Sequence, residues 1–244
     1  LYGQGVWKDS ETLEPTDDVR EVLKQGTLSV GFIGLAEALV ALTGVHHGQS
    51  TEADELGFQI ISYMREKVDQ ASEQYDLNFS LIATPAEGLS GRFTKKDRAT
   101  FGVIPGVTER DYYTNSFHVP VYYNTRAIDK INVEGKYHNL CNGGHISYIE
   151  VDGDVTKNTQ ALDTLVKAMA KANIGYGSIN HPVDRCTSCG YTGIIDHACP
   201  SCDNQDEEMI ERIRRITGYL VGDMKKWNSA KRREESERVK HQGK

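Results

Sequence analysis

The sequence predicts an α/β fold that is followed by a small metal-binding module. Between residues 26 and 179, segments with helical spacing of apolar residues alternate with short apolar runs of strand-like composition. After Pro182 the composition changes, and four cysteines fall between Cys186 and Cys202. At 244 residues and 38% apolar content, the chain is long enough to form a sizeable core. We therefore expect an α/β layer or barrel with a domain boundary near residue 182.

The first two elements are expected to be helical. The segment Gly26–Gly44 is almost entirely apolar or small and predicts a buried helix or helix pair, with Gly44 as its C-terminal stop. From Thr51 to about Tyr75, apolar residues recur at helical spacing and predict a long amphipathic helix. Thr51 and Asp54 are a possible capping pair at its start.

Strand signals then alternate with one more helix. Short apolar runs at Leu77–Ala83, His118–Tyr123 and Ile146–Val151 predict strands. The spacing of apolar residues over Lys157–Asn173 predicts a helix, and Ile174–Ile179 is typical of the strand that follows one. This alternation is the basis for the expected α/β layer or barrel.

The end of the chain is charged. Asp206 opens an acidic stretch that is typical of a helix start. Residues 223–244 carry eight Lys or Arg against four Asp or Glu and few apolar residues, which predicts a solvated helix or a loose tail.

Charge and hydropathy exclude several classes of protein. With 28 basic and 35 acidic side chains the formal net charge is −7, so nucleic acid and anionic membranes are not expected partners. No apolar run approaches the roughly 20 residues that span a bilayer, and the N-terminus lacks the features of a signal peptide. We expect a cytoplasmic protein. Because the chain begins at Leu1 without methionine, we also expect a fragment or a processed chain.

The cysteines predict one metal site. Cys186-x-x-Cys189 and Cys199-x-x-Cys202 form two knuckles, each of which turns two thiolates toward one tetrahedral ion at roughly 2.3 Å. All-sulfur ligation favours zinc or an iron centre, and four protein ligands leave no open position, so we expect structural zinc. Two separate redox pairs or buried free thiols are the alternative. His197 lies between the knuckles and is a possible substitute ligand.

Two further segments carry candidate chemistry. In RRITGYLVG, Gly218 follows a helix-like stretch, and its spacing alone is typical of a capping glycine. In TPAEGLSGRF, free backbone N–H groups and the hydroxyls of Thr84 and Ser90 follow a strand and are suited to hold an anion. The alternative for this turn is a capping box formed by Thr84 and Glu87.

The chain resembles the anaerobic, class III ribonucleotide reductases. The resembling strings run from near residue 1 to the end: SVGFIGLAEAL (29–39), NFSLIATPAEGLSGRF (78–93), YYTNSFHVPV (112–121), NGGHISYIE (142–150), GYGSINHPVD (175–184), the two cysteine knuckles, and RRITGYLVG through KRREESERVKH. This resemblance implies the C-terminal half of a ten-stranded α/β barrel over residues 1–182. It further implies a zinc-ribbon-like module over 183–204, and a glycyl-radical loop with a charged tail over 205–244.

The resemblance also implies an activity. Gly218 matches the glycine that a radical-SAM iron–sulfur activating enzyme converts to a stable radical. Ribonucleoside triphosphates would be reduced to 2′-deoxyribonucleoside triphosphates, with formate as co-substrate, by a homodimer whose ATP and dNTP effectors bind outside this chain. The substrate phosphates would lie against the residues of the strand-end turn, namely Thr84, Ala86, Glu87, Gly88 and Ser90.

The resembling segments do not include the cysteine that carries the thiyl radical in this family. The radical passes in this family to a cysteine, but Cys141 is the only cysteine outside the knuckles and is typical of a buried small residue. The thiyl cysteine is therefore expected upstream of Leu1, and this chain alone is expected to be inactive. The alternative functions are a non-catalytic zinc-ribbon interaction module and a stand-alone glycyl-radical carrier subunit.

Overall fold

The structure is a computed structural model that describes residues 5, 6, 8, 10–153, 155–181, 183–215 and 224–241. Short 3₁₀ turns lie at Val155–Lys157, Glu207–Met209 and Met224–Lys226. The helices and strands in chain order are α1 (Arg20–Leu23), β1 (Leu28–Phe32), α2 (Leu35–Thr43), α3 (Thr51–Tyr75), β2 (Phe79–Ala83), α4 (Gly88–Phe101), α5 (Ala127–His138), β3 (Ser147–Glu150), α6 (Thr159–Lys171), β4 (Gly177–Asn180), β5 (Val183–Cys186), β6 (Thr192–Gly193), β7 (Ile210–Ile213) and α7 (Ser229–Ser236).

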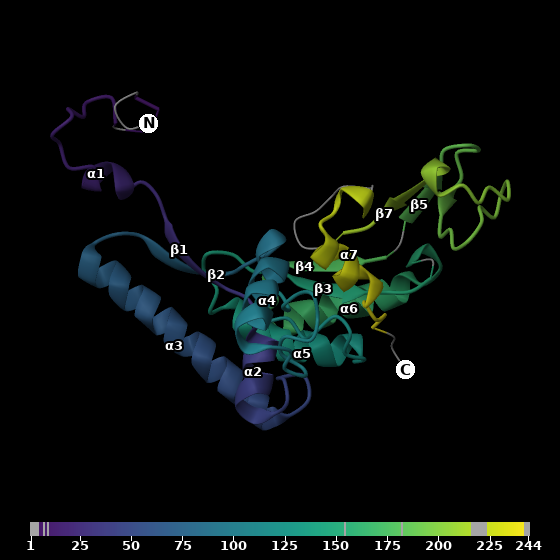
Figure 1. The fold of residues 1–244 in the computed structure, drawn as a ribbon, viewed down its shortest axis with the longest axis horizontal. Helices are drawn as coiled ribbons and strands as arrows, with labels where there is room; N and C mark the ends of the chain where they lie inside the picture. The colour runs from purple at the N-terminus through teal and green to yellow at the C-terminus, as the bar shows by residue number, and fades with distance from the viewer. Residues whose placement is uncertain are drawn as a thin grey trace.

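Two parallel strand pairs form the centre of the molecule. Strand β1 pairs with β2, and α2 and α3 connect them. Strand β3 pairs with β4, and α6 connects them. Parallel strands need such crossover connections, so each pair is a strand–helix–strand unit. A bridge between Ile82 and Gly144 adds a parallel contact beside β2. The predicted mixed α/β architecture is confirmed. In Figure 1 the arm with α1 and the sheet with β5 and β7 project from opposite sides of this body.

The long helix α3 has the predicted bounds but a different cap. The Oγ atom of Ser50 accepts a hydrogen bond from the N–H of Ala53 at 3.1 Å, so Ser50 and not the Thr51–Asp54 pair caps the helix. Ile61 and Val68 are buried on one face of α3 and pack into the main core. The other members of that core come from α2, β2, α5 and nearby loops: Leu35, Leu39, Leu81, Ala83, Phe117, Tyr137 and Cys141.

Three predicted elements are corrected by the structure. The segment Gly26–Gly44 is not wholly helical, because its first part is β1, which gains a full parallel register with β2. Its predicted stop is confirmed, since Gly44 ends α2 with a φ of 85°. His118–Tyr123 is a turn, since the N–H of Tyr123 donates to the carbonyl of Pro120 at 2.9 Å. The acidic start at Asp206 leads into a 3₁₀ turn and β7, not an α-helix.

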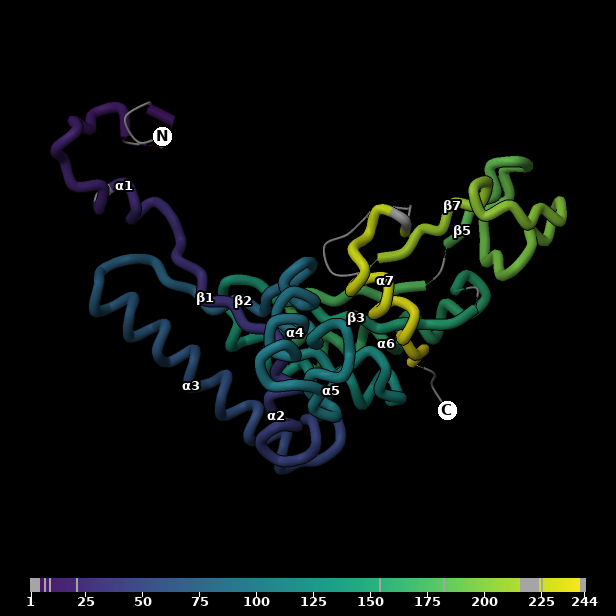
Figure 2. Tube along the Cα trace, viewed as in Figure 1, coloured from purple at the N-terminus to yellow at the C-terminus, as the bar shows by residue number. Residues whose placement is uncertain are grey.

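The charged C-terminal segment is packed and not solvated. Helix α7 lies against α4, and Figure 2 shows the yellow end of the chain crossing the body of the molecule. Trp227 is 2% exposed, Lys231 0% and His241 5%. Lys231 forms an ion pair at 2.6 Å with Glu234, so the buried charge is neutralised within the helix. The prediction of a solvated helix or loose tail is therefore wrong.

No helix among the described residues has both the length and the apolar character that a bilayer crossing requires.

Helix α7 can approach α4 closely because position 91 is a glycine. A Cβ atom at Gly91 would lie 2.5 Å from the Cβ of Ala230, closer than real side chains pack. We predict that Gly91→Ala lowers the free energy of unfolding by about 1–3 kcal/mol through overpacking. Urea denaturation measures the change. In contrast, Gly88→Ala is the matched control, because a Cβ at Gly88 meets nothing within 4 Å.

The double variant Gly91→Ala/Ala230→Gly tests the cause. Removing the Ala230 methyl group relieves the contact, so the double variant should be less destabilised than the sum of the two single changes. Additive effects would show that the α4–α7 contact is not the source of the loss.

Candidate functional site

The four knuckle cysteines meet in one cluster at the end of the three-stranded sheet. Strand β5 supplies Cys186 and pairs with both β6 and β7. The first knuckle turns at Gly190, whose N–H donates to the carbonyl of Cys186 at 2.9 Å and whose φ is 78°. The second turns at Asp203, whose N–H donates to the carbonyl of Cys199 at 2.8 Å. Two similar turns therefore bring the four thiols together.

The spacing of the sulfur atoms fits one tetrahedral cation. The Sγ atoms of Cys186 and Cys202 are 3.7 Å apart, and those of Cys189 and Cys199 are 3.6 Å apart. All four ligand atoms lie within 4.8 Å of one another, and none of the cysteines forms a disulfide. A tetrahedron of sulfurs about 2.3 Å from a zinc ion has edges of about 3.8 Å. The predicted clustering of the knuckles is confirmed, and the identity of the metal remains a prediction.

The backbone around the knuckles favours thiolates. Burial raises the pKa of Cys186, but N–H groups of Cys189 and Ser188 outweigh it and lower that pKa to about 6. The N–H of Tyr191 likewise lowers the pKa of Cys189. At Cys202 the N–H of Asn204 lowers the pKa, but the neighbouring thiols raise it to about 12. Four thiolates so close together repel one another, and a bound divalent cation removes that repulsion.

A buried carboxylate connects the cluster to the rest of its sheet. Asp184 on β5 is 0% exposed and accepts from the N–H of Ile195 at 2.9 Å. It also forms an ion pair at 2.5 Å with Arg214, which directly follows β7. The chain therefore leaves the cysteine sheet at a fixed point, four residues before Gly218. Gly218 itself lies outside the described residues.

The strand-end turn joins β2 to α4. The alternative, a capping box formed by Thr84 and Glu87, is not supported, because Glu87 has helical dihedral angles and makes no side-chain cap hydrogen bond. Ser90 is 0% exposed, and its hydroxyl donates to the carbonyl of Glu87 at 3.2 Å. The N–H of Ala86 donates to the carbonyl of Thr84 at 2.9 Å. Gly88 is exposed and begins the first turn of α4, whose N–H groups point along the helix axis away from the helix.

The structure buries the fifth cysteine completely. Cys141 is 0% exposed and belongs to the main core with Leu81 and Phe117. Burial raises the pKa of its thiol to about 12. Cys141 therefore behaves as the buried small residue expected from the sequence.

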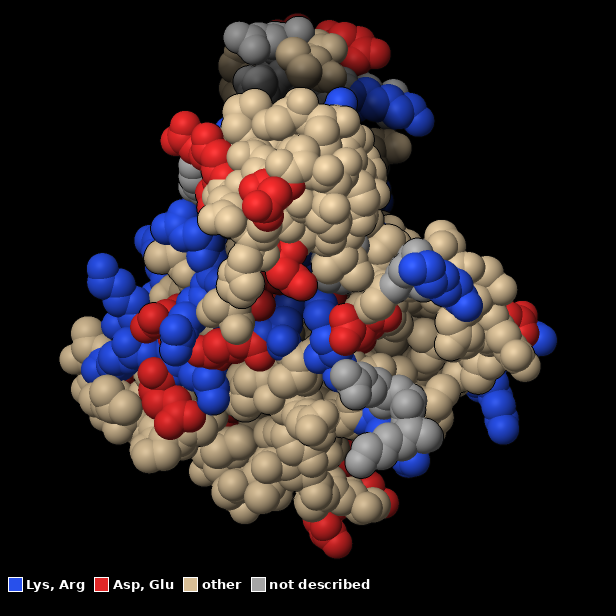
Figure 3. All heavy atoms as spheres, turned by 90° about the vertical axis from the view of Figure 1, so that its right-hand side faces the viewer, with Lys and Arg blue, Asp and Glu red and all other residues tan. Residues whose placement is uncertain are grey.

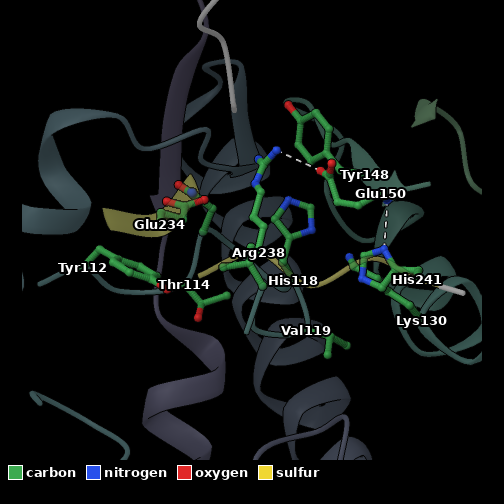
Figure 4. Close-up of a pocket in the computed structure, with 12 residues that line it drawn as sticks. Tyr112, Thr114, His118, Val119, Lys130, Tyr148, Glu150, Glu234, Arg238 and His241 are labelled. Atoms are coloured by element: carbon green, nitrogen blue, oxygen red, sulfur yellow. Dashed lines mark hydrogen bonds and ion pairs between the residues drawn. The ribbon is translucent and has the colours of Figure 1, made fainter. Parts of the chain in front are cut away.

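A small cavity lies where the tail meets β3, and the sequence did not predict it. Its volume is about 30 Å³, enough for a single water molecule. Figure 4 shows Arg238 reaching across it toward Glu150, with Tyr148 and His241 beside the pair. The full lining is Tyr112, Thr114, Asn115, His118, Val119, Val121, Lys130, Tyr148, Glu150, Glu234, Arg238 and His241. Arg238 and His241 in the segment KRREESERVKH contact Glu150 at the end of β3. A contact between residues so far apart in the chain leaves no periodic pattern in the sequence, so counting charges could not predict this cavity.

A second buried network lies beneath this cavity. Glu134 on α5 is 0% exposed and bonds Lys130, the N–H of Val119 and the hydroxyl of Ser147. Burial raises the pKa of Glu134, but the positive charge of Lys130 outweighs it, and the pKa is lowered overall. The Nε2 atom of His138 lies 2.9 Å from the Ser147 hydroxyl, and the His138 Nδ1 accepts from the N–H of Gly175 at 3.2 Å. His138 is therefore neutral, with its proton on Nε2.

Glu37 on α2 is another buried carboxyl group that the sequence did not single out. It is 4% exposed, and its Oε1 accepts from the N–H of Thr114 at 2.9 Å and from the Thr114 hydroxyl at 2.7 Å. Burial raises its pKa.

Seen from the side of the cysteine sheet, the surface does not carry one sign of charge. Figure 3 shows basic and acidic side chains mixed across this face. It therefore lacks a broad one-sign field of the kind that attracts a polyanion.

Comparison with known proteins settles the family. A family model described as anaerobic ribonucleoside-triphosphate reductase matches residues 1–241. The chain belongs to this family. The anaerobic ribonucleoside-triphosphate reductase of Escherichia coli K12 is 39% identical over 252 residues, which cover 100% of this chain and 35% of that protein. The protein of the same name from phage T4 is 36% identical over 250 residues, which cover 99% of this chain and 39% of that protein.

Solved structures of the family share the fold. An anaerobic ribonucleotide reductase gives a TM-score of 0.74 at 23% identity, over 91% of this chain and 35% of the other. The enzyme from Thermotoga maritima with MES in the active site gives 0.64 at 24% identity, over 79% of this chain and 32% of the other. This chain thus spans little more than a third of the length of the curated relatives it matches.

We predict that the purified protein contains close to one zinc ion per chain. Cys202→Ser removes one thiolate and should reduce the zinc content by most of its value, as measured by inductively coupled plasma mass spectrometry. The control is His197→Ala, which changes an exposed residue between the knuckles and should leave the zinc content unchanged. Retention of full zinc by Cys202→Ser, or loss of zinc in His197→Ala, would contradict the four-thiolate site.

Stability should fall in mild acid because His138 is buried in its neutral form. Burial, with His145 nearby, lowers its pKa from 6.5 to about 4. Between these values the unfolded chain binds a proton and the folded chain does not, so stability present at neutral pH is lost as the pH falls below about 6.5. His138 alone should lower the free energy of unfolding by about 2 kcal/mol from pH 7 to pH 5.

Urea denaturation of the wild type and of His138→Gln at the two pH values measures that contribution. Glutamine keeps one donor and one acceptor but does not titrate. The variant should therefore lose less stability than the wild type from pH 7 to pH 5, by about that amount. Identical losses in the two proteins would show that His138 does not resist protonation.

Proposed function

We propose that this chain contributes the radical-storing part of an anaerobic ribonucleoside-triphosphate reductase, with the radical on Gly218. The observation that carries the proposal is the four-thiolate cluster in a chain that matches the reductase family over residues 1–241. The sheet that holds the cluster runs through β7 and Arg214 directly into the segment that contains Gly218. A cluster placed there supports the backbone on one side of the radical position.

The chemistry explains why position 218 is a glycine. An activating enzyme of the radical-SAM iron–sulfur class would remove one hydrogen atom from its Cα. The unpaired electron is then delocalised over the adjacent amide nitrogen and carbonyl group. Glycine has no side chain to hinder the abstraction or to oppose a planar Cα.

The proposed reaction balances with formate as the reductant. The glycyl radical takes a hydrogen atom from a cysteine thiol, and the resulting thiyl radical removes the 3′ hydrogen atom of the ribose and later returns it. The 2′ carbon–oxygen bond breaks, and the oxygen leaves as water. Formate becomes carbon dioxide and supplies two electrons, so one formate and one proton are consumed for each deoxyribonucleotide formed.

The thiyl cysteine is proposed to lie outside this chain. Four of its five cysteines form the metal cluster, and Cys141 is fully buried with a raised pKa. The knuckle thiols would be bound to the metal, and the thiol of Cys141 is buried where a ribose does not reach it. The remaining half of the barrel, the homodimer contacts and the nucleotide effector sites are proposed to correspond to the parts of the relatives that this chain does not cover.

The strand-end turn is the proposed site of the substrate phosphates. Its residues are Thr84, Ala86, Glu87, Gly88 and Ser90. The exposed first turn of α4 at Gly88 supports this role, because the N–H groups of a first helical turn are ready donors for an anion. Ser90 is committed to the carbonyl of Glu87, so we assign it to holding the turn in place.

Two other functions account for part of the same geometry. In a non-catalytic interaction module the zinc ribbon would bind a partner, and Gly218 would only end a helix. In a stand-alone radical carrier the chain would complement another subunit. Both differ from the proposal in a measurable way, because the first predicts no radical and the second predicts activity only after a separate subunit is added.

Electron paramagnetic resonance spectroscopy tests the radical. After anaerobic incubation with the activating enzyme, S-adenosylmethionine and a reductant, the wild-type reductase should give a doublet from the one remaining Cα hydrogen of Gly218. Gly218→Ala should abolish both the doublet and nucleotide reduction. The control is Gly222→Ala in the same segment, which should keep the doublet.

A doublet that survives Gly218→Ala would exclude Gly218 as its source. The absence of any signal in the wild type would favour the interaction module.

A further inference from the structure

The two ends of the segment 216–223 are each held by buried or half-buried side chains. On the first side, Arg214 pairs with Asp184 at 2.5 Å, and Arg215 reaches the Ser178 hydroxyl at 3.4 Å and the Tyr176 hydroxyl at 3.2 Å. On the second side, a 3₁₀ turn at Met224–Lys226 leads into α7, which packs on α4.

Arg238 connects these two sides directly. Its Nη1 atom donates to the backbone carbonyl of Arg215 at 2.8 Å. The same atom lies 2.9 Å from Oε1 of Glu150 and 3.3 Å from Oε2 of Glu235. The side chain of Arg238 is 7% exposed. Burial lowers the pKa of Arg238, but the three nearby glutamates outweigh it and raise the pKa, so the guanidinium is fixed in its charged form.

Glu150 fastens this connection to the parallel sheet. It ends β3, and its Oε1 accepts from the Nδ2 of Asn180 at the end of the neighbouring strand β4, at 2.9 Å. The backbone of Glu150 is held as well, because its N–H donates to Nδ1 of His241 at 2.9 Å and its carbonyl accepts from the N–H of His241 at 2.8 Å. The sheet, the tail and the carbonyl of Arg215 thus share one guanidinium. We name Glu150, Arg238 and the Arg215 carbonyl the tail anchor.

We propose that Arg238 is a positioning residue for the radical segment, which it holds at its first end through the carbonyl of Arg215. The inference rests on the proposed function, because it takes Gly218, three residues beyond Arg215, as the radical position. Arg238 does not need to touch the substrate or the radical. It keeps the carbonyl of Arg215 at the carboxyl ends of β3 and β4, the edge at which ligands bind in open α/β sheets.

The charge of Arg238 makes this a strong contact. Hydrogen bonds from a charged donor contribute more than neutral ones, and Glu150 cannot remain buried without a partner. Replacing Arg238 by glutamine removes the charge and leaves a side chain too short to contact the carbonyl of Arg215. The population of molecules in which the Arg215 carbonyl is held should then fall by about tenfold or more.

The experiment uses the complete reductase and its activating enzyme. Arg238→Gln should reduce the yield of the glycyl doublet, measured by spin counting, by about tenfold or more. Arg238→Lys keeps the positive charge on a shorter stem and should restore part of that yield. Arg233→Gln is the matched control, because Arg233 lies exposed on the same tail and should leave the yield unchanged.

A second measurement does not depend on the radical. Hydrogen–deuterium exchange of the unactivated protein should be faster in peptides covering residues 211–223 of Arg238→Gln, and unchanged in the β1–β2 unit. If the wild type gives no doublet, the proposed function fails, while the exchange result still tests the tail anchor. A wild-type doublet together with equal yield and equal exchange in Arg238→Gln would refute the positioning role.

Glu150→Gln covers the case in which Arg238→Gln does not fold. Glutamine has nearly the shape of glutamate and keeps an oxygen for Asn180, but it loses the charge that holds Arg238. As for Arg238→Gln, the yield of the doublet should fall and hydrogen–deuterium exchange over residues 211–223 should become faster. A folded Glu150→Gln protein with neither change would overturn the proposal.

Discussion

The ion pair between Glu150 and Arg238 joins parts of the chain that are far apart in sequence. It is buried, so both charges have given up their hydration, and neither can be left alone without a large cost. Because Glu150 ends a strand of the parallel sheet and Arg238 follows α7, the pair requires the C-terminal tail to lie across the strand ends. The contact of Ala230 with Gly91 and the bonds of His241 then follow from the same placement.

This arrangement holds Arg214 and Arg215, which precede the segment that contains Gly218, by two supports that share Glu235. One is the cysteine sheet, in which the cluster fixes β5 and Asp184 fixes Arg214. The other is the tail, which returns to the carbonyl of Arg215. The first is suited to metal-coupled folding, since binding of one ion by four ligands would order the knuckles. The second depends on buried charge and needs no metal.

The sequence predicted what local spacing encodes. The helix Thr51–Tyr75 follows from apolar periodicity, and the cysteine cluster follows from two knuckles of equal spacing. Spacing could not predict that Leu28–Phe32 would form a strand, because that depends on β2 fifty residues later. Nor could it predict the burial of Lys231 and Arg238, because the sequence alone does not show whether a charged side chain faces water or a buried partner. The candidate phosphate turn was placed at the end of a strand, but its hydrogen bonds differ from those of the alternative capping box.

The packing of α7 has a consequence for a chain that is cut. Residues 224–241 are held to the body by contacts that include those of α7 with α4, the backbone of Val121 and the buried pair at Glu150, none of which is covalent. A break in the backbone anywhere between residues 216 and 223 would leave those contacts in place. The two pieces would separate on a denaturing gel yet migrate as one particle under native conditions. Native size measurements would therefore not distinguish the cleaved protein from the intact one.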